Sequence, residues 1–219
     1  MAYLCDYVRI RLGTPLAERL SLFWSSWDAL RLGSRVGRFP LADRLDLVLK
    51  GICLHGVDER DKVAFPEPGA MRCALVVESA RFLLDKLATP ERDRLLRDPK
   101  GLVSLGCREV TKAVLFPVRF LYTAETGKVA NNPQAVDWFS ARPAGPTRAL
   151  VLAASAWRER GTVDGTDRTI AALREGLLPL YESLAARYRD LLHEFGEGQL
   201  AAGIEAWRAR LKSTANVVQ

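Results

Sequence analysis

The clearest pattern in the chain is a run of apolar residues at helical spacing between Glu109 and Thr126. These positions recur every three or four residues and extend onto a second face, which predicts a helix buried deep in a bundle. Gly127 follows the last turn, where a left-handed residue commonly ends a helix. Pro117 lies inside the run and removes one backbone hydrogen bond, so we expect a kink there. The apolar positions are Val110, Ala113, Val114, Val118, Leu121 and Ala124, with Phe116 and Phe120 on the second face.

A second helix is predicted directly afterwards, from Asn132 to Phe139. Asparagine is a favoured capping residue, and Pro133 suits the first helical position because no N–H is required there. Helical spacing dominates the rest of the chain from Met71 onward, and Thr166 or Asp167 is expected to cap a later helix. The other helices expected in this part cover residues 71–87, 92–96, 146–157, 169–175, 178–195 and 199–211.

The first quarter of the chain shows a mixed pattern. Apolar and polar residues partly alternate over residues 20–25, which predicts a strand, and Ile52–Leu54 suggests a second brief strand. Short helices are expected over residues 3–12, 27–31 and 41–49, and Ser26 is expected to cap the second of them. We therefore predict an α+β fold, mostly α. It would consist of a partial α/β region over residues 1–60 and a helical bundle over residues 69–219, connected by the polar segment 58–68.

Composition and charge narrow the function classes. With 48% hydrophobic and 26% charged residues the chain reads as an ordinary soluble protein, and the net charge of +6 is compatible with anionic partners such as nucleotides. The four scattered cysteines and two histidines do not form a zinc pattern. Asp6 and Arg9 interrupt the start where a signal peptide would be apolar, and no stretch is long enough to cross a membrane. These observations predict a cytoplasmic protein with no membrane partner, and nucleic acid is not an expected partner.

The run from Arg119 to Trp138, RFLYTAETGKVANNPQAVDW, closely resembles the helical C-terminal domain of aminoglycoside adenylyltransferases, members of the nucleotidyltransferase superfamily. A looser resemblance extends from about Leu20 to Trp157. The resemblance implies a partial catalytic sheet followed by a helical domain that closes over a nucleotide. It also implies ATP and Mg²⁺ as cofactors, and transfer of AMP to a hydroxyl of a small molecule.

The catalytic carboxylates of that superfamily have no clear counterpart. Its Gly-Ser and Asp-x-Asp motif places two aspartates on one face of a strand, where they share magnesium. Here Gly33-Ser34 precedes Asp43 and Asp46, which are three positions apart and would share a face only on a helix. Asp28 flanks the predicted strand that would carry the general base. We predict no metal site, with Asp28, Asp43 and Asp46 as the candidate catalytic residues. We expect a chain that is truncated or catalytically impaired.

The resemblance also assigns substrate or nucleotide contacts. Glu109 falls where the family has an acidic residue facing the acceptor, although a carboxylate at a helix start is equally explained by the helix dipole. Lys128 matches the lysine of the family's T-G-K corner. Asn132 stands where the family has a second lysine for the triphosphate, which removes a charge. Trp157 falls where the family has a tyrosine near the nucleotide, and a core role explains an aromatic residue there as well.

Two alternatives belong to other classes. Arg187 and His193 resemble the arginine–histidine motif of small helical HEPN-type ribonuclease toxins. A non-catalytic module that binds a small molecule or nucleotide is the other alternative. An incomplete sheet would leave an exposed edge, and a homodimer would cover it.

Overall fold

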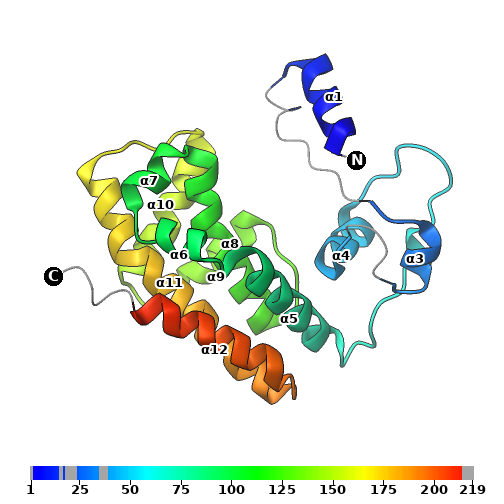
Figure 1. The fold of residues 1–219 in the computed structure, drawn as a ribbon. Helices are drawn as coiled ribbons and strands as arrows, with labels where there is room; N and C mark the ends of the chain where they lie inside the picture. Colours follow the sequence, from blue (N-terminus) through cyan, green and yellow to red (C-terminus); the bar gives the residue numbers. More distant parts are fainter. Residues whose placement is uncertain (1, 15–16, 18–23, 35–38, 214–219) are drawn as a thin grey trace. The chain divides into compact units, whose positions relative to one another are not determined.

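A computed structural model describes residues 2–14, 17, 24–34 and 39–213 (Figure 1). The chain divides into two compact units, Met1–Phe65 and Pro66–Gln219. Each unit is described by itself below.

The described part of the first unit contains three α-helices and one 3-10 turn. Helix α3 begins as predicted, because the Ser26 hydroxyl accepts a hydrogen bond from the Ala29 N–H at 3.1 Å. Helix α4 ends before Gly51, also as predicted. The elements are α1 (Ala2–Leu12), α3 (Trp27–Arg31), α4 (Leu41–Lys50) and η1 (Arg60–Lys62).

The predicted α+β class is wrong, because the described residues form helices and no strand or sheet. Ile52–Leu54, predicted as a strand, is irregular chain, and the side chains of Ile52 and Leu54 are 81% and 92% exposed. A strand is held by hydrogen bonds to a neighbour, and this apolar triplet has none within the described residues. Residues 20–23 of the other predicted strand lie outside the described residues, and Trp24 is an isolated bridge residue.

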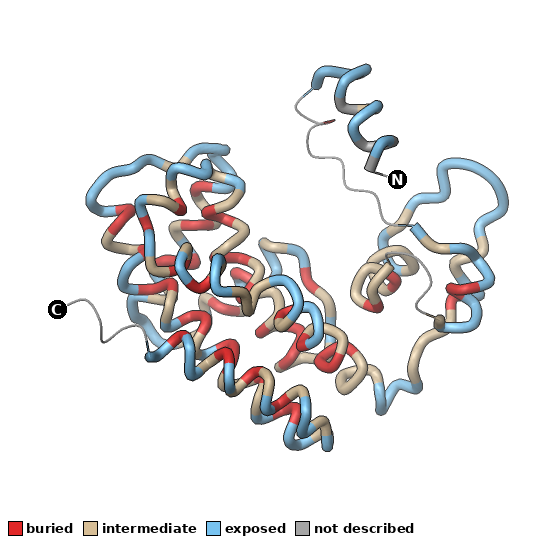
Figure 2. Tube along the Cα trace, in the orientation of Figure 1, coloured by how far each residue is buried: buried red, intermediate tan, exposed pale blue. Residues whose placement is uncertain are grey.

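The second unit is a bundle of helices. Its buried residues, red in Figure 2, follow the facing sides of the helices and form one apolar core. The elements are α5 (Met71–Phe82), η2 (Leu83–Leu87), α6 (Pro90–Leu95), α7 (Pro99–Ser104), α8 (Cys107–Thr126), α9 (Asn132–Ser140), α10 (Pro146–Arg160), α11 (Asp167–Glu194) and α12 (Gly198–Ser213).

Helix α8 packs against α5, α7, α9, α10 and α11, as its apolar pattern on two faces predicted. Gly127 ends it at φ +67°, in the left-handed region. Helix α9 is capped one residue earlier than predicted, because Asn131 and not Asn132 accepts a hydrogen bond from the Gln134 N–H. Gln134 in turn accepts one from the Asn131 N–H, which completes a capping box.

Helix α11 is a single helix where the sequence predicted two, and Thr166 caps its start. Gly176 does not break the helix. A Cβ at this position would lie 2.8 Å from the Leu150 Cβ and 2.9 Å from the Pro146 carbonyl oxygen, so glycine lets α11 approach α10 closely. Pro179 removes the hydrogen bond to the carbonyl of Glu175, an exposed residue whose backbone can be hydrated instead. Tertiary packing thus accounts for Gly176 and solvent exposure for Pro179, and the helix continues through both.

A polar cluster joins α12 to α6 inside this bundle. The Trp207 indole Nε1 donates to Asp93 Oδ1 at 3.0 Å, and Arg210 Nε donates to Asp93 Oδ2 at 3.1 Å. Arg210 also donates to the Ala88 carbonyl at 2.6 Å. Trp207 is fully buried and Asp93 is 5% exposed, so one carboxylate satisfies a buried indole and a guanidinium from the last helix.

Candidate functional site

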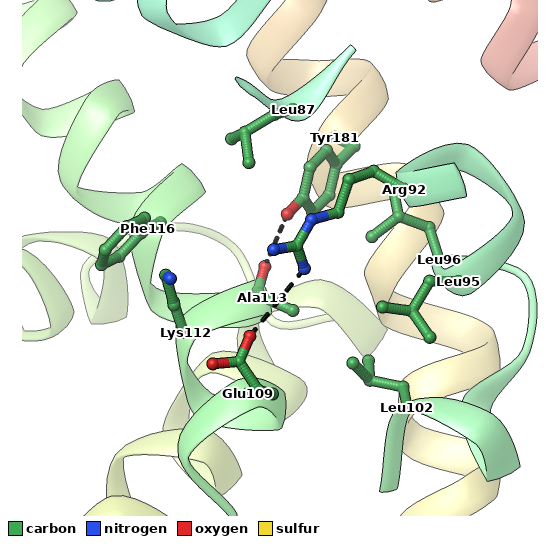
Figure 3. Close-up of a pocket in the computed structure, with 10 residues that line it drawn as sticks. All are labelled: Leu87, Arg92, Leu95, Leu96, Leu102, Glu109, Lys112, Ala113, Phe116 and Tyr181. Carbon is green, nitrogen blue, oxygen red and sulfur yellow. Dashed lines mark hydrogen bonds and ion pairs between the residues drawn. The ribbon is translucent and has the colours of Figure 1, made fainter. Parts of the chain in front are cut away.

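A recess opens between α6, α7, α8 and α11 of the helical bundle (Figure 3). Its enclosed volume is about 30 Å³, within about 400 Å³ of empty space that includes solvent at its mouth. An enclosed space of this size holds a water molecule or a small terminal group rather than a whole ligand. The residues that line it are Leu87, Arg92, Leu95, Leu96, Leu102, Glu109, Lys112, Ala113, Phe116 and Tyr181.

Three charged side chains stand among the apolar residues of the recess. Arg92 Nη1 lies 3.9 Å from Glu109 Oε2, a long ion pair between half-buried side chains. Lys112 Nζ lies 5.4 Å from the centre of the Phe116 ring, within range of a cation–π interaction. Glu109 and Lys112 share a face of α8 because they are three residues apart on the helix. The recess therefore combines an apolar lining with two cations and one carboxylate.

Tyr181 of α11 lines the recess and supplies a hydrogen bond that α8 lacks. Its hydroxyl donates to the Ala113 carbonyl oxygen at 3.0 Å (Figure 3). In a regular helix that carbonyl would accept from the N–H of residue 117, but Pro117 has no N–H. Burial raises the pKa of Tyr181 well above its ordinary value, and nearby Arg92 lowers it by less. The hydrogen bond that Pro117 removes from α8 is thus replaced by one from a side chain of α11.

Replacing Tyr181 by phenylalanine should lower the free energy of unfolding by about 1–2 kcal/mol, because the Ala113 carbonyl loses its donor. In a Pro117→Ala background the helix supplies an N–H, so the same replacement should cost about 1 kcal/mol less. A double-mutant cycle by urea unfolding measures the coupling. The control is Tyr188→Phe, whose hydroxyl donates to the Phe120 carbonyl at 3.1 Å, an oxygen that the N–H of residue 124 also serves. Equal coupling for the two tyrosines would contradict the compensation.

The three predicted catalytic carboxylates, Asp28, Asp43 and Asp46, all lie on helices of the first unit. Asp28 is exposed and pairs with Arg31 at 3.1 Å. Asp43 and Asp46 both lie on α4, as the helical interpretation predicted, and Asp46 pairs with Lys50 at 2.8 Å. No group of three or more histidine, cysteine, aspartate or glutamate side chains in the described ranges is arranged to hold a metal ion.

Of the four predicted binding residues, Glu109 lines the recess and the other three do not. Trp157 is 6% exposed and packs in the core, and its carbonyl oxygen lies 3.4 Å from the Cys107 sulfur, which donates to it. Lys128 is exposed beyond the end of α8. Asn132 is the first residue of α9, and its Oδ1 atom is buried without a hydrogen-bond partner in the described structure.

Arg187 and His193, the two residues of the ribonuclease alternative, both lie on α11. Arg187 forms a two-point pair with Glu125 on α8, at 2.8 and 3.0 Å, which joins α11 to α8. His193 is exposed near the end of α11. The pair with Glu125 gives Arg187 a structural role in the bundle.

The sequence missed Arg92, Lys112 and Tyr181 as site residues. A signal for Lys112 was present, because it follows Glu109 by three positions on a helix that was predicted. Arg92 and Tyr181 come from helices far away in the sequence, and no local pattern connects them to Glu109. The carboxylate thus acquires its neighbours only through the packing of α6 and α11 on α8.

Comparisons with known proteins add no relative. No family model, curated protein or solved structure matches the chain significantly. Within the described residues, the structure contains no helix that is both long enough and apolar enough to span a lipid bilayer.

Proposed function

We propose that the helical bundle is a small-molecule binding domain related to the helical domain of nucleotidyltransferases, with the recess as its ligand site. The observation that carries the proposal is the recess itself, where the charged side chains of Arg92, Glu109 and Lys112 stand among apolar residues. The resemblance assigns Glu109 to the acceptor, and this residue lines the recess. Apolar walls with a few convergent polar groups are typical of ligand sites.

The proposal assigns binding rather than AMP transfer to the described residues. Two-metal chemistry needs carboxylates that converge on the transferred phosphoryl group. Asp28 and Asp46 instead pair with Arg31 and Lys50 on their own helices. Helical geometry keeps Asp46 within reach of Lys50, four residues later. The ion pairs therefore provide a structural role for two of the three candidate carboxylates.

Filling the recess tests the proposal. Ala113→Leu places a larger side chain against Tyr181 and should abolish binding of any ligand held there, because the enclosed volume is small. The measurement is ligand-observed NMR with a panel of small carboxylates, amines, aminosugars and Mg²⁺–ATP. The matched control is Ala153→Leu, a half-buried alanine of α10 that packs against the same core outside the recess.

The expected result is at least one panel member that binds the wild type and the Ala153→Leu protein but not Ala113→Leu. Thermal unfolding of both variants confirms that they are folded. A panel in which no compound binds, or in which every bound compound is retained by Ala113→Leu, would show that the recess is not a ligand site. If the wild type bound ATP in a Mg²⁺-dependent manner and Asp46→Ala lost that binding, the result would instead support an active enzyme.

A further inference from the structure

The charges of the recess favour a different ligand from the cationic aminosugar of the resembling family. We propose that the recess binds a small amphipathic anion, a short apolar chain that ends in one carboxylate; this inference rests on the proposed function. Two cations and one carboxylate line the recess, so its charged groups sum to one positive charge. A monoanion neutralises that charge, whereas a polycation would increase it.

The lining selects the body of the ligand. Seven of its ten residues are leucine, alanine, phenylalanine or tyrosine, and the Tyr181 hydroxyl is already used by the Ala113 carbonyl. The hydroxyl and ammonium groups of an aminosugar would lose water in such a lining without gaining partners, which is unfavourable. Methylene or methyl groups gain free energy from the same transfer. The apolar lining therefore favours an alkyl group over a sugar.

The cations are placed to receive the head group. Lys112 makes a cation–π contact with Phe116, and the described residues include no ion-pair partner for it. Arg92 approaches Glu109 only to 3.9 Å, longer than a charge-assisted hydrogen bond. Figure 3 shows Arg92 and Lys112 on either side of the Glu109 carboxylate. A ligand carboxylate can thus pair with either cation without displacing a short protein contact.

The size of the recess limits the chain length. The enclosed part is about 30 Å³, which accommodates the end of a narrow alkyl chain. The carboxylate would then remain at the half-exposed mouth beside Lys112. Affinity in the millimolar range is expected for so few buried atoms, because small ligands gain only about 0.3–1.5 kcal/mol per non-hydrogen atom.

A pair of ligands with the same length and opposite charge tests the inference on the full chain. Hexanoate and hexylamine are titrated against the wild type by NMR at low ionic strength, and the Ala113→Leu protein shows whether binding occurs in the recess. Wild type should bind hexanoate at least about fivefold more tightly than hexylamine, as expected for a difference of one or two partly exposed charges. Added salt should reduce this preference, since it screens exposed charges.

Three substitutions separate the charges. Lys112→Met should weaken hexanoate binding about two- to fivefold, and Glu109→Gln should strengthen it by a similar factor, because a like charge is removed. Lys212→Met, at an exposed lysine of α12 outside the recess, should leave hexanoate binding unchanged. Tighter binding of hexylamine than of hexanoate, or weaker hexanoate binding by Glu109→Gln, would overturn the anion assignment.

If amines bind but Ala113→Leu abolishes that binding, the proposed function remains and only the ligand class fails. If neither hexanoate nor any other panel compound depends on the recess, the proposed function fails as well.

Discussion

Replacing Asp93 by alanine should lower the free energy of unfolding of the helical bundle by about 2–4 kcal/mol. The substitution removes the acceptor of the Trp207 indole and the carboxylate that pairs with Arg210. Trp207 is fully buried, so its N–H has no water to replace the lost partner. The guanidinium of Arg210 is 46% exposed and can be hydrated, so most of the effect comes from the indole. Urea unfolding followed by circular dichroism measures the change.

Asp93→Asn and Trp207→Phe separate the two contributions. Asparagine keeps an oxygen for the indole and loses only the charge, so it should cost about 1 kcal/mol. In a Trp207→Phe background the indole donor is absent, and Asp93→Ala should then cost clearly less than in the wild type. An Asp93→Ala protein as stable as the wild type, or one whose loss is unchanged by Trp207→Phe, would contradict the role of this cluster.

The bundle should lose stability steeply above pH 10 because of two buried tyrosines. Burial raises the pKa of both Tyr181 and Tyr188 well above the ordinary value of tyrosine, while Arg92 and a hydrogen bond from Ser79, respectively, lower it by less. The folded-state pKa thus exceeds the unfolded-state pKa of about 10, so the protonated form is favoured in the folded protein. Its contribution is fully present below pH 10 and is lost as the pH rises toward the folded-state pKa.

In this range each tyrosine should lower the free energy of unfolding by about 1.4 kcal/mol per pH unit, which amounts to about 5 kcal/mol for the two together at pH 12. Denaturant unfolding at pH 8, 10, 11 and 12 measures the slope. The Tyr181→Phe, Tyr188→Phe double variant is the control. It should be less stable than the wild type at pH 8, because two hydrogen bonds to α8 are lost, and less sensitive above pH 10. Equal slopes for the two proteins would exclude these tyrosines as the cause.

Local sequence patterns were sufficient for most helices of the bundle. The apolar spacing of 109–126 predicted a helix buried on more than one face, and α8 has that position. Ser26 and Thr166 act as caps because a side-chain oxygen close to a helix start can accept one of its free N–H groups. Gly127 ends α8 because it adopts positive φ without strain. All these features depend on residues within one or two turns of each other.

The errors occur where local pattern and packing disagree. Partial alternation of apolar and polar residues suggested a sheet, but a strand is stable only against a neighbour, and Ile52–Leu54 has none in the described structure. The sequence predicted two helices, over residues 169–175 and 178–195, but close packing of Gly176 against Leu150 and hydration of the exposed Glu175 carbonyl allow α11 to continue. A neighbouring strand and the α10 surface that faces Gly176 are both distant in sequence, so no local pattern could predict them.

The sequence by itself determined that Glu109 lies near the start of a long buried helix and that Pro117 interrupts the hydrogen bonds of that helix. Only the tertiary structure decided what these two features produce. Packing of α6 and α11 brings Arg92 beside the carboxylate and the Tyr181 hydroxyl to the Ala113 carbonyl, across 17 and 68 residues of chain. The spacing of apolar residues predicts which face of a helix is buried, because burial depends on apolar area. It does not predict which side chain lies opposite that face, because such pairing depends on the arrangement of whole helices.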